Sequence, residues 1–92
     1  MKNLIFTQQF IREGETIVAY CPELDVSSCG ATTDQARANL QTAVKLFLEE
    51  AERLGTLRDI LAEAGYDPTG SELASPVIGM MWGTLPLEGL AV

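Results

Sequence analysis

The sequence predicts an α+β fold, in which an antiparallel sheet of three to four strands carries one long helix on one face, in the order β-β-β-α-α-β. Two observations lead to this prediction. Three short apolar segments separated by turn-forming residues open the chain, and a long segment with apolar residues at helical spacing follows. A chain of 92 residues has the size of one small domain. We therefore expect a single domain over residues 1–92, with a core over residues 1–66 and a loop, a C-terminal strand and a tail over residues 67–92.

The first part of the expected sheet is a meander of three strands. Residues 3–12 alternate loosely between the two faces of a strand, and the polar residues 12–15 ("REGE") are typical of a hairpin turn. Residues 16–21 ("TIVAYC") are rich in β-branched and aromatic side chains, which favour a second strand. Pro22 ends that strand because proline has no N–H to donate, and residues 26–31 form a short third strand.

The long helix is expected to begin after Thr32 and to stop at Gly55. Thr32 and Gln35 have the spacing of a capping box, and Glu49 and Arg53 have the spacing of an exposed ion pair. The apolar residues recur on one face of this helix. They are Ala36, Leu40, Ala43, Val44, Phe47, Leu48, Ala51 and Leu54.

Two further elements are expected after the long helix. Residues 57–64 form a shorter helix that turns four apolar side chains inward and ends at Gly65. Residues 77–84 are apolar and lack the charges of a helix surface, so they are expected to form a fourth strand. The last residues are either loosely held or bound to a neighbour.

The composition narrows the classes of function. The formal net charge is −7, which disfavours contact with phosphate backbones and favours a basic partner. The chain has no histidine, which is both the usual general base near neutral pH and the commonest metal ligand. No cofactor, metal or direct nucleic-acid contact is expected. The apolar run near the start is too short for a signal peptide, and the apolar residues 76–92 are interrupted by glycines, two prolines and Glu88, so they are not a membrane span. A cytoplasmic protein is expected.

The two cysteines, Cys21 and Cys29, are too few for a disulfide scaffold. If the flanking strands form a hairpin centred on Asp25, the two residues face each other at a distance that a disulfide can span. In a reducing compartment, two buried free thiols are favoured over a bridge.

Residues 17–50 combine several features. They are Tyr20 at the end of an apolar strand, the turn Pro22-Glu23-Leu24, Gly30, Thr32, Ala36 with Asn39, and the acidic helix end Glu49-Glu50. In this combination the segment resembles the HicB-like antitoxin family. The resemblance implies a partial ribonuclease H-like fold and a non-enzymatic antitoxin that binds and neutralises a small, basic, mRNA-cleaving toxin of the HicA type, often as a dimer or tetramer. Family members commonly carry a further DNA-binding segment, but the residues after Tyr66 include neither lysine nor arginine.

Five acidic residues are candidates for contact with a basic partner, and we expect the turn "PELD" to shape that surface. They are Glu23, Asp25, Glu49, Glu50 and Glu52. The alternative is that Glu23 and Asp25 are solvated turn residues and that the helix-end charges only face water. A metal-dependent nuclease of ribonuclease H type would need several carboxylates to converge on two metal ions, and their spacing does not bring them together. No catalytic residue is therefore assigned.

Five apolar residues are candidates for self-association. A single helix covers only one face of a sheet, yet the strand over residues 16–21 is apolar on both faces. Either the chain's own second helix and tail cover the other face, or a second molecule does, by packing on the sheet or by strand addition through the tail. The candidates are Val18, Tyr20, Met80, Met81 and Trp82. A solitary protein- or peptide-binding module without a toxin partner is the alternative function.

Overall fold

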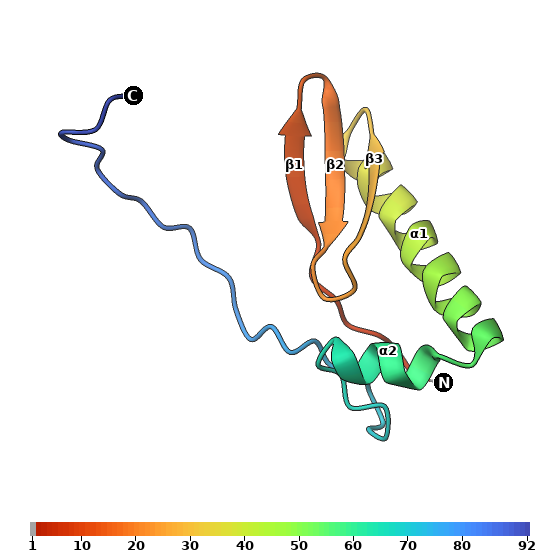
Figure 1. Ribbon diagram of the computed structural model, residues 1–92. Coiled ribbons are helices and arrows are strands. Elements are labelled where there is room, and N and C mark those ends of the chain that lie inside the picture. Colours follow the sequence, from red (N-terminus) through yellow and green to blue (C-terminus); the bar gives the residue numbers. More distant parts are fainter. Residues whose placement is uncertain (1) are drawn as a thin grey trace.

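The computed structural model describes residues 2–92, and within them it has the predicted α+β class and the order β-β-β-α-α (Figure 1). The elements are β1 (Gln9–Glu13), β2 (Thr16–Cys21), β3 (Val26–Gly30), α1 (Thr33–Leu54) and α2 (Leu57–Glu63). Each strand pairs antiparallel with the next one in the chain, so the order across the sheet is β1-β2-β3. The predicted meander is therefore confirmed.

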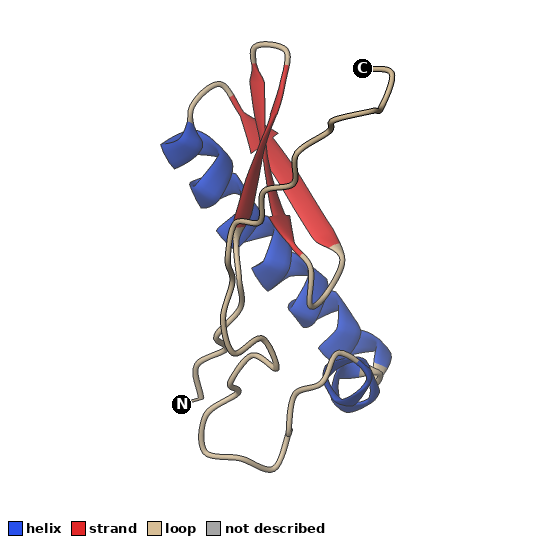
Figure 2. Ribbon diagram, turned by 90° about the vertical axis from the view of Figure 1, so that its left-hand side faces the viewer, coloured by secondary structure: helices blue, strands red, loops and turns tan. Residues whose placement is uncertain are grey.

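Helix α1 lies along one face of the sheet, and the core forms between them (Figure 2). Ala19 and Cys21 on β2 and Leu40 on α1 have no exposed surface. Helix α2 continues beneath the lower end of the sheet and adds Leu61 to the same core. The buried residues of this cluster are Ile17, Ala19, Cys21, Leu24, Ala36, Leu40, Val44, Leu61 and Tyr66.

The ends of α1 follow the predicted local signals. The hydroxyl of Thr32 accepts a hydrogen bond of 3.1 Å from the backbone N–H of Gln35, whose own side chain accepts one of 3.0 Å from the N–H of Ala31. Gly55 ends the helix with a φ of 77°, a left-handed conformation that favours glycine. The last residue of the predicted apolar face is the exception, because Leu54 is 61 % exposed.

The N-terminal segment differs from its prediction. The strand expected over residues 3–12 begins only at Gln9. Before it, Leu4 forms an isolated parallel bridge with Leu73, and the N–H of Ile5 donates to the carbonyl of Leu73 over 2.9 Å. The hydroxyl of Tyr66 also donates to the carbonyl of Ile5 over 2.8 Å. The backbone groups of the first residues are therefore bonded to the connection after α2 and not to β2.

The fourth strand predicted over residues 77–84 is wrong. This segment runs away from the body as extended chain without a strand partner, and Ile78 and Trp82 are fully exposed (Figure 1). The radius of gyration is 16.2 Å, whereas a compact chain of this length has about 12 Å. The tail therefore does not cover the open face of its own sheet.

The pairing of the two cysteines is also different. Cys21 lies opposite Val26, and Cys29 lies opposite Val18. Cys21 is therefore buried under α1 while Cys29 is exposed on the other face, and both thiols are free. The prediction that the two residues face each other is wrong, and of the two thiols expected to be buried only Cys21 is.

Neither helix within residues 2–92 is long and apolar enough to cross a membrane.

Candidate functional site

The turn between β2 and β3 has a braced backbone. Leu24 is 8 % exposed and packs in the core, so it holds the middle of the turn against the body. Asp25 has a φ of 54°, a left-handed conformation that Asp tolerates better than most residues. Its carboxylate accepts a hydrogen bond of 2.8 Å from the hydroxyl of Tyr20, and this bond raises the pKa of Tyr20. Asp25 itself stays exposed.

Glu23 connects three segments that are far apart in the chain. Its carboxylate accepts hydrogen bonds of 2.8 Å from the N–H and from the hydroxyl of Thr7, and a third from the hydroxyl of Ser75. Burial raises the pKa of Glu23, but the bonds from Ser75 and Thr7 outweigh it and hold the pKa below its usual range. The interpretation of Glu23 as a solvated turn residue is therefore wrong, and the side chain ties the turn to both ends of the domain.

Replacing Glu23 with glutamine is expected to lower the free energy of unfolding by about 1–2 kcal/mol at neutral pH, because charge-assisted hydrogen bonds become neutral ones in a partly solvated place. A carboxylate with a depressed folded pKa stabilises the fold above its unfolded pKa of about 4.3, and this contribution disappears as the pH falls through the folded value. The difference in the free energy of unfolding between wild type and Glu23→Gln should thus be largest near pH 6 and should shrink below about pH 4.

Urea unfolding at a series of pH values measures this difference. Glu49→Gln, on the exposed surface of α1, is the matched control and should change stability little at any pH. A loss in Glu23→Gln that stayed constant down to about pH 3 would show that the charge of Glu23 has no part in the effect.

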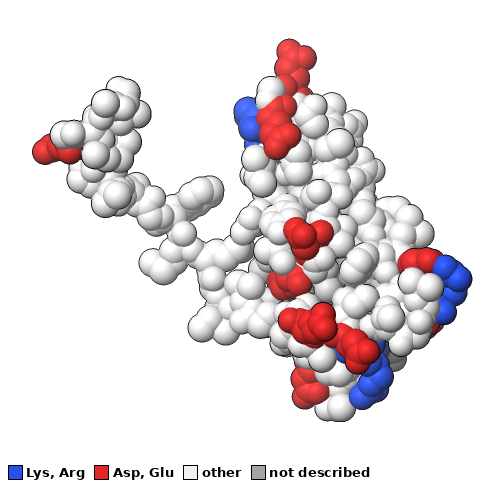
Figure 3. Space-filling model, in the orientation of Figure 1, with Lys and Arg blue, Asp and Glu red and all other residues white. Residues whose placement is uncertain are grey.

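The turn and α2 together form a shallow acidic groove of about 220 Å³. Leu24, Ile60 and Ala64 supply its apolar lining. Glu23, Asp25 and Glu63 also line it, and Asp25 and Glu63 are exposed there. Figure 3 shows acidic side chains gathered over the lower part of the molecule, with Lys and Arg beside them. Glu63 was not among the residues predicted for this surface. Glu63 lies next to Ala64 at the end of the short helix, and Ala64 was predicted to point inward. The packing of that helix under the turn, however, was not predictable from local patterns.

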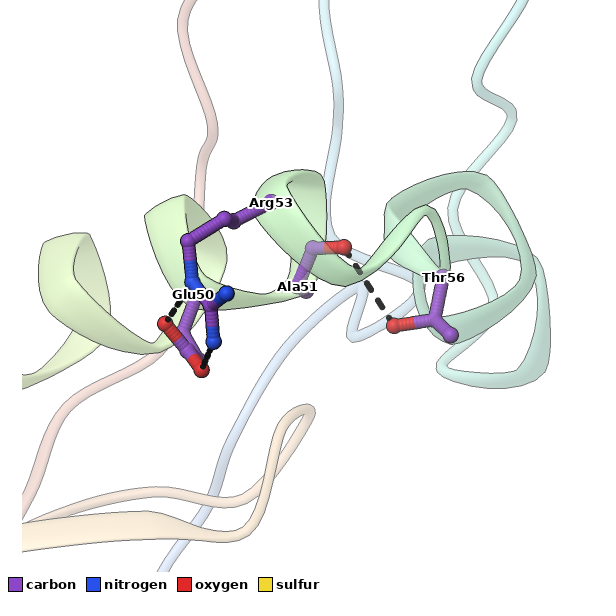
Figure 4. A network of polar contacts seen from close by, with 4 residues as sticks. All are labelled: Glu50, Ala51, Arg53 and Thr56. Atoms are coloured by element: carbon purple, nitrogen blue, oxygen red, sulfur yellow. Dashed lines mark hydrogen bonds and ion pairs between the residues drawn. The ribbon is translucent and has the colours of Figure 1, made fainter.

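The acidic end of α1 does not belong to this groove. Glu49, Glu50 and Glu52 are exposed and are absent from the groove lining. Glu50 pairs with Arg53, whose Nε donates to it over 2.9 Å and whose Nη2 makes a second contact (Figure 4). This pairing lowers the pKa of Glu50. The predicted Glu49–Arg53 pair is thus replaced by an i,i+3 pair, and the five candidate acids fall into two separate groups.

Figure 4 also shows how α1 connects to α2. The hydroxyl of Thr56 donates to the carbonyl of Ala51 over 3.3 Å, and its N–H donates to the same carbonyl over 2.9 Å. These bonds give the carbonyl of Ala51 further donors at the end of α1, where carbonyls lack the next turn of the helix. Ala51 is buried, so the junction is anchored in the body.

The self-association candidates also fall into two groups. Val18 and Tyr20 are half-buried on the sheet face opposite α1, where Ile11 and Cys29 lie beside Val18 on the neighbouring strands. Met80, Met81 and Trp82 lie on the tail. The tail group lines a trough of about 790 Å³ whose other side is residues 8–11 at the start of β1. The structure therefore brings the tail candidates near the edge of the sheet and not onto Val18 or Tyr20.

Metal-ligating residue types do not converge in the part of the chain that the structure describes. Within residues 2–92, no three or more His, Cys, Asp or Glu side chains are placed to hold a metal ion. The carboxylate of Glu23 accepts a hydrogen bond from the hydroxyl of Thr7, whereas that of Asp25 accepts one from the hydroxyl of Tyr20.

A comparison of the chain with models of protein families, with curated proteins and with solved structures finds no match.

Proposed function

We propose that this chain is a non-enzymatic, cytoplasmic, HicB-like antitoxin domain that binds and neutralises a small, basic, mRNA-cleaving toxin of the HicA type. The observation that carries the proposal is the groove between the turn and α2, with its apolar lining and its rim of carboxylates. Arg and Lys side chains have an apolar stem and a charged head, so an apolar groove with an acidic rim suits them. The resemblance of residues 17–50 to the HicB-like family includes the turn that forms one wall of this groove.

The bracing of the turn supports a binding role. Leu24 is anchored in the core and Glu23 is hydrogen-bonded to Thr7 and Ser75, so the groove wall needs little reorganisation when a partner arrives. A surface that is already ordered loses less conformational entropy on association. Asp25 and Glu63 remain exposed beside it, and they are the charges we assign to direct contact with the partner. The net charge of −7 adds long-range attraction for a basic protein.

The test measures RNA cleavage by a purified HicA-type ribonuclease in the presence of the full chain. Wild type is expected to inhibit cleavage, and the double variant Asp25→Asn/Glu63→Gln is expected to bind about tenfold more weakly, because two rim charges are removed. Asparagine also tolerates the left-handed conformation at residue 25. The matched control is Glu13→Gln/Glu15→Gln, which removes two exposed charges at the hairpin between β1 and β2 and should inhibit like wild type.

Inhibition by the Asp25→Asn/Glu63→Gln variant equal to that of wild type would exclude the groove as the contact surface. A complete lack of inhibition by wild type would favour a module that binds another protein or a peptide. Incubation of the chain alone with labelled RNA and Mg²⁺ or Mn²⁺ tests the nuclease alternative, and metal-dependent cleavage lost in Asp25→Asn would establish it.

A further inference from the structure

The tail leaves the body in a direction set by its base. The hydroxyl of Ser75 donates to Glu23, and Pro76 packs so closely on Gly65 that a Cβ at Gly65 would lie 2.8 Å from the Pro76 ring. The N–H of Val77 then donates to the hydroxyl of Ser75 over 3.0 Å. Within the described chain, the residues beyond Val77 make no backbone hydrogen bond to the sheet or to the helices. The tail therefore starts from an anchored point and then continues without support.

The composition of the tail between its two prolines suits a strand. Residues 77–85 lie between Pro76 and Pro86 and contain neither proline nor charge, so each residue has an N–H, and only that of Val77 is already bonded, to Ser75, among the hydrogen bonds of the described chain. Met81 and Trp82 are 96 % and 100 % exposed. Such a run of large apolar side chains in water marks a surface that another molecule covers.

The edge of the sheet beside the tail has no pairing partner. At the opposite edge, the side-chain amide of Asn39 on α1 donates to the carbonyl of Cys29 on β3 over 2.7 Å. Among residues 2–92, strand β1 has a neighbour only on its β2 side, and Phe10 and Ile11 on it are 40 % and 44 % exposed. An unprotected apolar edge strand is a template for pairing with a further chain.

The chain's own tail lies across a trough from this edge and is not paired with it. Residues 8–11 line one side of the trough of about 790 Å³, and residues 80–82 line the other. In Figure 2 the tail crosses in front of the strands, and Figure 1 shows that it moves away from β1 toward its C-terminal end. Within residues 2–92 no backbone hydrogen bond joins the two sides of the trough, so the edge of β1 stays open to a further strand.

We propose that two copies of this chain exchange tails, so that residues 77–85 of each copy lie in the trough of the other as a strand added to β1. The order across the dimer is then β1, the partner's tail, the chain's own tail and the partner's β1. This arrangement is two-fold symmetric, fills both troughs and leaves neither β1 edge free. It goes beyond the proposed function, since the exchanged residues 77–85 are not part of the lining of the acidic groove.

The exposed apolar surface is sufficient for such an interface. A stable interface buries roughly 800 Å² on each partner, and Trp82 alone contributes about 200 Å². Ile78, Met80, Met81 and Leu85 add further large apolar side chains, each at least 61 % exposed. The β1 edge adds Phe10 and Ile11 together with the new backbone hydrogen bonds.

The experiment combines sedimentation equilibrium of the full chain with the fluorescence of Trp82, which is the single tryptophan. Wild type is expected to be a dimer at tens of micromolar, and its emission should shift to longer wavelength on dilution as Trp82 becomes exposed. Met81→Pro, which removes one ladder N–H, should weaken the dimer at least tenfold. Ala91→Pro, also in the exposed tail but outside the exchanged segment, is the control and should behave like wild type.

Because Met81 is almost fully exposed in the single chain, its replacement cannot unfold the body, and far-UV circular dichroism should be unchanged. A cross-link tests the exchange directly. A Gln9→Cys chain mixed with a Met81→Cys chain, both with Cys29→Ser, should oxidise to a mixed covalent dimer, whereas Leu90→Cys in place of Met81→Cys should not. A monomer at every concentration, with Trp82 either exposed or buried, would overturn the proposal. So would a dimer insensitive to Met81→Pro.

Discussion

Replacing Leu40 with alanine is expected to lower the free energy of unfolding by about 2–5 kcal/mol. Leu40 has no exposed surface and packs from α1 into the cluster formed with β2 and α2. The substitution removes buried methyl groups and leaves a cavity that the surrounding side chains fill only in part. A domain of this length has a total stability of about 5–14 kcal/mol, so the variant should be marginally folded or unfolded at 37 °C.

Urea unfolding followed by far-UV circular dichroism measures the loss at Leu40. The matched control is Leu46→Ala, the same substitution on the same helix at a residue that is 59 % exposed. The control should change stability by less than about 0.5 kcal/mol. Equal losses in the two variants would contradict the packing of α1 on the sheet through the face that contains Leu40.

The second large effect is expected at Gly30, the last residue of β3. A Cβ at this position would lie 2.7 Å from the backbone nitrogen of Ala36 and 2.8 Å from the Cβ of Gln35. Both atoms belong to the first turn of α1, which the Thr32 cap holds in place. Gly30→Ala should therefore push β3 and α1 apart and cost about 1–3 kcal/mol, as overpacking typically does.

The control for this variant is Gly79→Ala, measured by the same unfolding experiment at low protein concentration. Gly79 has open space where a Cβ would point, so the substitution should change stability by less than about 0.5 kcal/mol. If Gly30→Ala proved as stable as wild type, the close contact between β3 and the start of α1 would be disproved.

The elements that local signals specify were predictable from the sequence. The cap at Thr32, the stop at Gly55 and the apolar face of α1 depend on residues a few positions apart, and the structure has all three. The start of β1 was not predictable in this way. Residues before Gln9 bond to Leu73, and no local pattern reveals a partner so far along the chain.

The faces of the two cysteines show how sensitive a hairpin prediction is to the length of its turn. A hairpin centred on Asp25 would place Cys21 opposite Cys29, but the actual turn is shorter and places Cys21 opposite Val26. Side chains alternate between the faces of a strand, so an odd change in register moves a residue to the other face. Cys29 is consequently exposed and Cys21 is buried. The choice of turn length depends on Leu24 entering the core, which is a tertiary contact.

The candidate site was predicted in part. The turn that shapes its wall was identified from proline and acidic residues, but the partners of Glu23 are 16 and 52 positions away, at Thr7 and Ser75. Glu63 joins the groove only because α2 docks under the turn. Sequence patterns identify which residues are acidic and exposed, whereas their grouping into one surface depends on the arrangement of the helices.

The hydrogen bonds that Glu23 accepts from Thr7 and Ser75 predict how related sequences vary at these three positions. One carboxylate accepts hydrogen bonds from two hydroxyl-bearing residues at opposite ends of the domain, so loss of Glu23 leaves both Thr7 and Ser75 without this partner. Thr7, Glu23 and Ser75 should therefore be inherited as a set. Chains that lose the acid should also be free to lose both hydroxyls.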